Sequence, residues 1–98
     1  MLNIKKTVEN QKAEFALEGR LDTLTAPELE TEINGLNEIK ELILDMQNLE
    51  YVSSAGLRVL LIAQKIMNKQ GAMVVKNVNE TVGEIFEVTG FSDIFTIE

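Results

Sequence analysis

Two short apolar stretches separated by a helical segment constrain the fold of this chain more than any other feature. Residues 41–46, ELILDM, and residues 72–78, AMVVKNV, are short, largely apolar runs of the kind that form buried strands. Residues 54–70 between them have the length and composition of a helix. Because strand, helix and strand connect in a right-handed crossover, these segments predict two parallel strands covered by the helix.

The N-terminal residues predict a hairpin beside this unit. Residues 1–8, MLNIKKTV, and residues 12–19, KAEFALEG, are strand candidates, and ENQ between them is prone to turn. Apolar residues alternate in the second stretch, as expected for a strand with one buried face. We therefore expect the two stretches to pair in an antiparallel hairpin.

Two further helices have recognisable starts. Thr25 followed by Glu28 fits a capping box, and Pro27 suits the first helical turn, where a missing N–H is harmless. Asn79 is the expected N-cap of another helix, which stops at Gly90. These signals predict one helix between the hairpin and the crossover and one after it.

The segments together predict an α/β fold in a single domain spanning residues 1–98, with a mixed sheet of four or five strands packed with α-helices. The number of strands depends on the last residues, IFTIE, which either add a short strand or pack against the sheet. A domain of this length has little room for a deep internal active site.

Composition excludes several kinds of site. The chain has no cysteine, which removes disulfides, thiolate nucleophiles and soft-metal sites. It has no histidine, which removes the usual general base and the usual zinc ligand. We therefore expect no metal, no cofactor and no catalytic residue.

The charge and the hydropathy pattern limit the surroundings and partners of the chain. A net charge of −7 should repel nucleic acid and anionic membrane surfaces. The first residues lack the apolar core of a signal peptide, and no apolar run is long enough to span a bilayer. We expect a cytoplasmic protein with no nucleic-acid partner and no membrane insertion.

Two catalytic interpretations fail on spacing. A nucleophilic Ser54 would need a base, and Lys65 and Lys69 lie too far along the helix to reach its start. A phospho-aspartate switch at Asp45 would need an adjoining acidic pair to hold magnesium, and none precedes it. The sequence favours a protein that is not an enzyme.

The most informative segment is residues 51–61, YVSSAGLRVLL, which follows the strand at residues 41–46. Ligands gather outside the carboxyl ends of parallel strands, so this segment is expected at a functional edge of the sheet, and Asp45 is expected to end the preceding strand there. Ser53 or Ser54 is the N-cap of the helix, a role that by itself explains a serine. Glycine in a first helical turn costs about 1 kcal/mol relative to alanine, so Gly56 indicates that another group or chain approaches closely.

A helical projection of residues 57–70 predicts a core face and a second patch. The core face comprises Val59, Leu60, Ala63, Ile66 and Met67. Leu61 falls on the opposite side, among Arg58, Gln64, Lys65 and Asn68, with Leu57 at the border. An apolar residue ringed by polar ones is typical of a small protein-docking site, although a single exposed leucine also occurs without any function.

Three stretches of the sequence carry a resemblance to one known family. They are DMQNLEYVSSAGLRVLL, GAMVVKNVNETVGEIFEVTGFSDIFTI and the N-terminal EGRLDTLTAPELE, and the resemblance itself covers nearly the whole chain. They closely resemble the STAS domain of bacterial anti-sigma factor antagonists, also called anti-anti-sigma factors. The most specific part is a serine, a small residue and a Gly-Leu pair at the start of the central helix.

The resemblance implies a regulatory switch. Family members are typically phosphorylated on the serine two residues before the Gly-Leu pair, which is Ser54 here. Many carry an aspartate where this chain has Ser53, so Ser53 is an alternative acceptor. The unphosphorylated form would bind an anti-sigma factor, often a serine kinase, and free the sigma factor. Phosphorylation would switch this binding off, and a serine phosphatase would restore it.

The resemblance also implies a docking surface on a chain that is monomeric when free. Asp22 matches an acidic family position near the phosphorylation site, and a turn-capping role explains it equally well. The expected partner-binding residues are Asp22, Ser53, Ser54, Ala55, Gly56, Leu57, Arg58 and Leu61. The alternative function is that of a non-enzymatic STAS subunit in another signalling assembly or in a lipid-transport complex.

Overall fold

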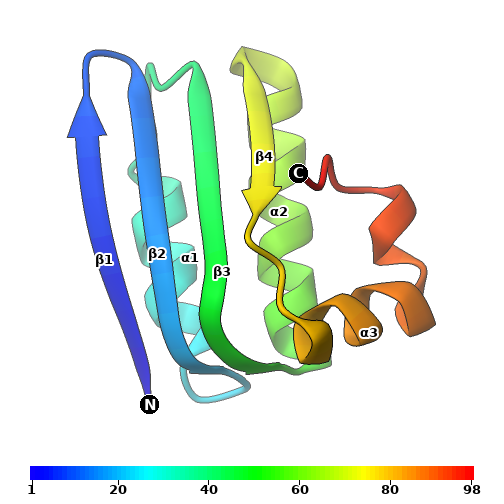
Figure 1. Cartoon of the computed structure of the whole chain (residues 1–98). Helices are drawn as coiled ribbons and strands as arrows, with labels where there is room; N and C mark the ends of the chain where they lie inside the picture. The colour runs from blue at the N-terminus through cyan, green and yellow to red at the C-terminus, as the bar shows by residue number, and fades with distance from the viewer.

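A four-stranded mixed sheet forms the centre of the computed structural model, which describes residues 1–98 (Figure 1). The strands lie in the order of the sequence: β1 is Leu2–Glu9, β2 is Lys12–Leu21, β3 is Glu41–Val52 and β4 is Ala72–Lys76. β1 pairs with β2 in antiparallel fashion, and β2, β3 and β4 run parallel to one another. Both the predicted hairpin and the predicted parallel crossover are confirmed.

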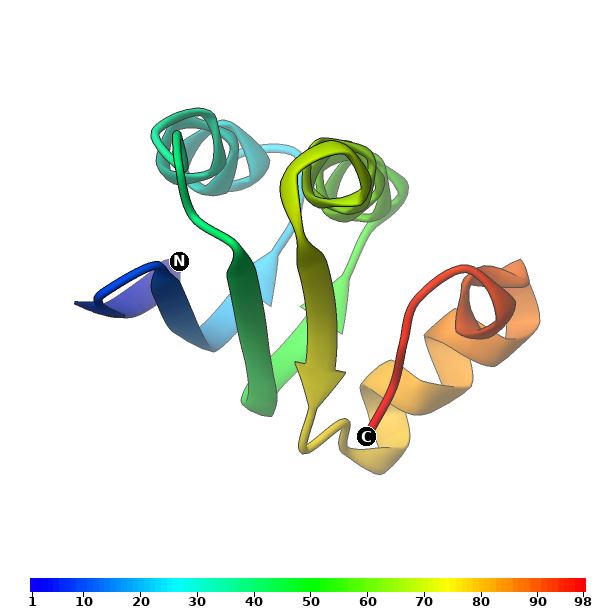
Figure 2. The ribbon, with the colours of Figure 1, turned by 90° about the horizontal axis from the view of Figure 1, so that it is seen from above.

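The chain has three α-helices: α1 is Ala26–Asn34, α2 is Ser54–Gln70 and α3 is Glu80–Thr89. A short 3-10 helix, η1, follows at Phe91–Asp93. Helices α1 and α2 cover one face of the sheet, whereas α3 lies beyond the edge formed by β4 (Figure 2). No helix is both long enough and apolar enough to cross a bilayer.

The core lies between the sheet and the two helices that cover it. The alternating side chains of β2, among them Phe15 and Leu17, point into it and are almost completely buried. Leu44 of β3, Leu29 of α1 and Leu60 of α2 are equally inaccessible. Burial of each such side chain contributes about 1.5–3 kcal/mol, so this shared core is what holds α1 and α2 on the sheet.

The start of α1 differs from the predicted capping box. Thr25 has helical backbone angles, and its side chain makes no cap hydrogen bond. Its hydroxyl instead donates to the Arg20 carbonyl at 2.8 Å and accepts from the Asp22 amide at 2.8 Å. The capping box is therefore wrong, because the hydroxyl is used to fasten the end of β2.

Strand β3 is longer than the six residues expected. It continues to Val52 because residues 47–52 keep pairing with β2 across two register shifts. Asp45 consequently lies inside the strand, paired with Ala16 of β2 and Lys76 of β4. The expectation that Asp45 ends the strand at the functional edge is wrong.

The C-terminal residues pack against β4 and form one isolated bridge. Ile97 and Val75 make this parallel bridge, in which the Val75 amide donates to the Thr96 carbonyl at 2.8 Å. Phe95 is buried and meets Phe86 of α3 edge-to-face, with ring centroids 5.4 Å apart. The sheet therefore has four strands, and the tail fastens α3 to its edge.

The buried face of α2 is wider than the helical projection predicts. Val59, Leu60, Ala63 and Met67 are buried as expected, and Ile66 is half-buried. Gln64 is also buried, which contradicts its predicted exposed position. Leu57 and Gln64 are two turns apart on the same edge of the helix, and the packing of the domain covers both. Leu61 is half-buried.

Candidate functional site

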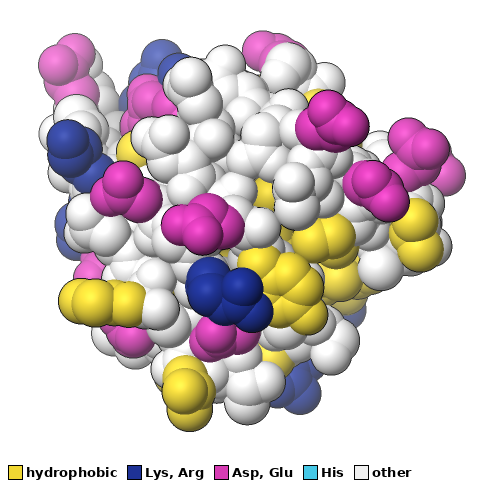
Figure 3. Space-filling view, turned by 60° about the horizontal axis from the view of Figure 1, so that its bottom comes forward, with side chains coloured by type: hydrophobic (Ala, Val, Ile, Leu, Met, Phe, Trp, Pro, Cys, Tyr) yellow, Lys and Arg dark blue, Asp and Glu magenta, His cyan; other side chains and the backbone are white.

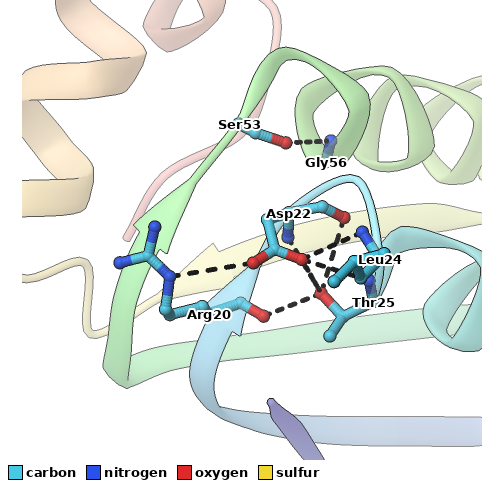
Figure 4. A network of polar contacts seen from close by, with 6 residues as sticks. All are labelled: Arg20, Asp22, Leu24, Thr25, Ser53 and Gly56. Atoms are coloured by element: carbon cyan, nitrogen blue, oxygen red, sulfur yellow. Dashed lines mark hydrogen bonds and ion pairs between the residues drawn. The ribbon is translucent and has the colours of Figure 1, made fainter.

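The two adjacent serines at the start of α2 have different positions. Ser53 has an extended backbone and is the N-cap, because its Oγ accepts a hydrogen bond from the Gly56 amide at 3.3 Å (Figure 4). Its own amide donates to the Leu21 carbonyl at 2.9 Å, so Ser53 is fixed against the end of β2. Ser54 is the first helical residue and is exposed. The hydroxyl of Ser54 is thus free of the capping role.

The position of Ser54 favours an anion. The first turn of a helix has amide groups without intrahelical partners, and the helix dipole places partial positive charge there. No acidic side chain occupies the first turn of α2. A negatively charged group on Ser54 would therefore be tolerated by the helix.

Gly56 is required by the packing of the chain on itself. A Cβ at this position would lie 2.7 Å from Cγ of Leu21, 2.8 Å from the Leu21 carbonyl oxygen and 3.1 Å from Cγ1 of Val52. The close group predicted from the sequence is therefore Leu21 at the end of β2. Because Gly56 is buried, it sets the position of the helix start and offers no surface to a partner.

Asp22 organises the loop between β2 and α1. Its Oδ1 accepts hydrogen bonds from the amides of Leu24 and Thr25 at 3.1 and 3.2 Å and from the Thr25 hydroxyl at 3.2 Å (Figure 4). Oδ2 faces Nε of Arg20 at 3.7 Å. Partial desolvation raises the pKa of the Asp22 carboxyl, but the hydrogen bonds from Thr25 and Leu24 outweigh it and hold the pKa below its ordinary value. The carboxylate is thus already occupied within the loop.

Arg20 and Tyr51 form a second feature of the same edge. The guanidinium carbon lies 4.5 Å from the centre of the Tyr51 ring, which is cation–π geometry. The surface at the lower end of the sheet carries a group of apolar side chains beside a basic one (Figure 3). Arginine and tyrosine are enriched where proteins meet, so this pair is a candidate contact that the sequence did not reveal.

A groove of about 480 Å³ lies between the start of α2 and helix α3. Its apolar lining is Tyr51, Val52, Leu57, Ile85 and Val88, and its polar lining is Ser54, Thr81, Glu84 and Thr89. Ser54 therefore stands on the wall of an apolar depression as well as at a helix start.

The expected docking residues are divided between this groove and its surroundings. Ser54 and Leu57 line the groove. Arg58 is exposed one turn further along α2, whereas Ala55 and Leu61 are half-buried.

The α3 wall of the groove was missed in the sequence, although its spacing contains the signal. Val82 and Phe86, four residues apart, form the buried stripe of α3. Thr81, Ile85 and Val88 follow a second stripe at intervals of four and three, and they face the groove. A valine that falls outside the stripe of Val82 and Phe86 was the available clue.

Comparison with known proteins agrees with the architecture. The family model of the STAS domain matches residues 3–98. BtrV of Bordetella bronchiseptica is 38% identical over 84 residues, which cover 83% of this chain and 72% of that protein. The anti-sigma-B factor antagonist of Staphylococcus aureus is 27% identical over 99 residues, covering 98% of this chain and 92% of that protein.

Solved structures show the same fold at low sequence identity. An anti-sigma factor antagonist from Mycobacterium paratuberculosis superposes with a TM-score of 0.86 at 20% identity, covering 99% of this chain and 85% of that one. The anti-sigma factor antagonist SpoIIAA in its unphosphorylated form gives a TM-score of 0.84 at 16% identity, with coverage of 98% and 88%. Since the family model spans nearly the whole sequence, this chain belongs to the STAS domain family.

Proposed function

We propose that this protein is an anti-sigma factor antagonist controlled by phosphorylation of Ser54. Its unmodified form binds an anti-sigma factor and thereby frees a sigma factor, and the modified form does not bind. The proposal is supported by the relative in Staphylococcus aureus, which is an anti-sigma-B factor antagonist. It is also supported by SpoIIAA, a structural neighbour that has been solved in both unphosphorylated and phosphorylated forms.

The observation that carries the proposal is the exposed position of Ser54 at the start of α2. Its neighbour Ser53 is half-buried and caps the helix, so the two hydroxyls are not equivalent acceptors. A kinase can reach Ser54 without breaking the cap. Ser54 is therefore the proposed phosphorylation site, and Ser53 serves the helix.

Phosphorylation would act at the surface and leave the fold intact. A phosphate adds nearly two negative charges at a helix N-terminus, which favours anions. A partner that packs on the neutral hydroxyl would have to desolvate the dianion. A penalty of about 3 kcal/mol from this desolvation would weaken binding by about a hundredfold or more.

The chemistry belongs to the partners. The chain offers no histidine or cysteine, and it is proposed to act in the cytoplasm as a regulatory substrate and binding protein. An anti-sigma factor with serine kinase activity would supply ATP and magnesium. A serine phosphatase would remove the phosphate and return the protein to its binding form.

Mass spectrometry on protein from its native cell, with mapping of the modified residue, tests the proposal. A phosphate on Ser54 that varies with growth condition is the expected result. Affinity capture with the unmodified protein should recover an anti-sigma factor related to histidine kinases, and Ser54→Asp should recover much less of it, whereas Ser54→Ala retains it. Phosphate on no serine, or equal capture by all three forms, would contradict the proposed switch.

A further inference from the structure

A second groove runs along α3, between this helix and the C-terminal residues that return to β4 (Figure 2). We call it the α3–tail groove; its volume is about 780 Å³, and every residue that lines it lies between Val78 and Ile97. Ser54 and the other residues of α2 therefore take no part in it. Val78, Ile97 and Val88 are its apolar lining, and Val88, which borders both grooves, is 81% exposed. This apolar surface is open to a second molecule.

Gly83 lines the α3–tail groove, and the backbone does not require a glycine there. It lies inside α3 without a positive φ, where glycine costs about 1 kcal/mol relative to alanine. A Cβ at this position would meet only Cγ1 of the half-buried Val78, at 3.3 Å. At Gly56 the missing side chain makes room for Leu21, whereas at Gly83 the room opens into the groove. The bare helix surface at Gly83 thus admits close approach of another molecule.

The α3–tail groove is acidic. Glu80, Glu84 and Glu87 all line it, and they follow one another at intervals of four and three along α3. Residues 77–98 contain no lysine or arginine, and none of the ion pairs of the structure involves a residue of α3. Three carboxylates without an ion-pair partner therefore surround the apolar lining, and they attract cationic groups.

This charge distribution decides which kind of occupant fits. A second copy of the chain placed symmetrically on the groove would bring two sets of glutamates together, which is unfavourable. The same glutamates would repel nucleic acid and anionic membranes. A protein segment that carries lysine or arginine on both sides of an apolar residue complements the carboxylates and the apolar lining together.

We propose that the α3–tail groove binds a short basic segment of a second protein partner, distinct from the anti-sigma factor. An apolar side chain of this segment lies over Gly83, and its cationic groups lie on Glu80, Glu84 and Glu87. Because Ser54 does not line the groove, the segment binds the unmodified and the phosphorylated form alike. The inference does not depend on the proposed function, and it gives the domain a surface that the phosphate does not control.

Nuclear magnetic resonance of the whole ¹⁵N-labelled protein tests the groove with a defined peptide. Glu80 and Glu87 are about 10 Å apart along the helix, so an extended peptide of about five residues spans them. The probe has a central leucine between two pairs of lysines and blocked ends, and it should shift the amide signals of Gly83, Glu87 and Ile97. A peptide with serine in place of leucine, and spermidine, should bind about fivefold more weakly, and a peptide with glutamates in place of the lysines should not bind. Raising the salt from about 0.05 M to about 0.5 M should weaken binding of the probe about tenfold.

Paired substitutions on the protein supply matched controls. Gly83→Ala places a methyl group in the groove and should weaken binding of the probe about threefold or more, without lowering the stability of the domain. Gly35→Ala adds the same group at an exposed glycine after α1, outside the groove, and should leave binding unchanged. Glu87→Gln should weaken binding about threefold and reduce its salt dependence, whereas Glu9→Gln on β1 should do neither. Ser54→Asp should bind the probe like the wild type.

Four results would overturn the inference: a serine peptide or spermidine that binds as tightly as the probe, shifts confined to the α2–α3 groove, a Gly83→Ala variant that binds like the wild type, or a Ser54→Asp variant that loses binding. Sedimentation equilibrium that shows a dimer strengthened by Glu87→Gln would assign the groove to a second copy of the chain and overturn it as well. None of these measurements uses the anti-sigma factor. Failure of the groove therefore leaves the Ser54 switch in place, and failure of the switch leaves the groove.

Discussion

Replacing Gly56 by alanine should destabilise the domain, although alanine is the better helix former. The added Cβ would lie 2.7 Å from Cγ of Leu21 and 2.8 Å from its carbonyl oxygen, separations that real Cβ atoms do not show. Leu21 is completely buried and its carbonyl accepts the Ser53 amide, so neither atom can move without shifting the end of β2. The start of α2 must therefore be displaced from the sheet.

The magnitude follows from two opposing contributions. Overpacking of this kind costs about 1–3 kcal/mol. Replacement of glycine by alanine within a helix returns at most about 1 kcal/mol. With the full helix gain subtracted, we expect the free energy of unfolding to fall by up to about 2 kcal/mol, and Tm to fall by about 4–8 °C for each kcal/mol lost in a domain of this size.

Urea unfolding followed by circular dichroism at the helix band measures this change. Gly83→Ala in α3 is the matched control, because its Cβ would meet only Cγ1 of Val78, at 3.3 Å. That variant should be as stable as the wild type or slightly more stable. A Gly56→Ala protein that gains stability like the control would refute the tight contact between α2 and the end of β2.

Four further substitutions test the site. Ser53→Ala should lower the free energy of unfolding by about 1 kcal/mol through loss of the cap, whereas Ser54→Ala should change it by less than about 0.5 kcal/mol; chemical denaturation with the opposite order would reverse the two roles. The lowered pKa of Asp22 means that its charged form stabilises the fold above the ordinary pKa of 3.8, and that this stabilisation is lost as the pH falls through the lower folded value. Asp22→Asn should therefore destabilise the protein at neutral pH and flatten the acid limb of its stability profile, and an unchanged profile would contradict this. Leu61→Ala should lower the free energy of unfolding by about 1 kcal/mol, because the side chain is half-buried. It should also weaken capture of the anti-sigma factor more than Ser54→Ala does. A variant that loses stability but captures the anti-sigma factor normally would place Leu61 only in the core.

The parts of the fold that the sequence predicts are those with local signals. The hairpin follows from apolar alternation in residues 12–19 and the turn before it. The parallel pair of β3 and β4 follows from two apolar runs around a segment of helical length. Each of these patterns lies in consecutive segments of the chain, so it does not depend on packing against distant residues.

The parts that the sequence does not predict depend on neighbours. Residues 47–52 are mixed in polarity, and they extend β3 only because β2 lies alongside and absorbs two register shifts. Thr25 has a side chain that can cap a helix, yet its hydroxyl donates its hydrogen bond to the carbonyl of Arg20 instead. Gln64 projects away from the predicted core face, but the packing around α2 extends to its side of the helix.

The sequence predicted where the candidate site lies, but it predicted only one of its two walls. The motif around Ser54 identified the start of α2 correctly, because capping and helix composition are local properties. It left open which serine caps the helix, since both have the right side chain. The groove could not be predicted, because its second wall is formed by Ile85 and Val88, about thirty residues further along the chain.

The separation of the two serines offers a practical means of observation. The chain contains no cysteine, so Ser54→Cys would create a single labelling site on the exposed first residue of α2. Because Ser53 keeps the cap, an attached fluorophore should leave the helix in place. A dye sensitive to its surroundings would then sit on the wall of an apolar groove. Since a group on Ser54 is proposed to obstruct the partner, its emission would report how the groove opens during unfolding, separately from the rest of the domain.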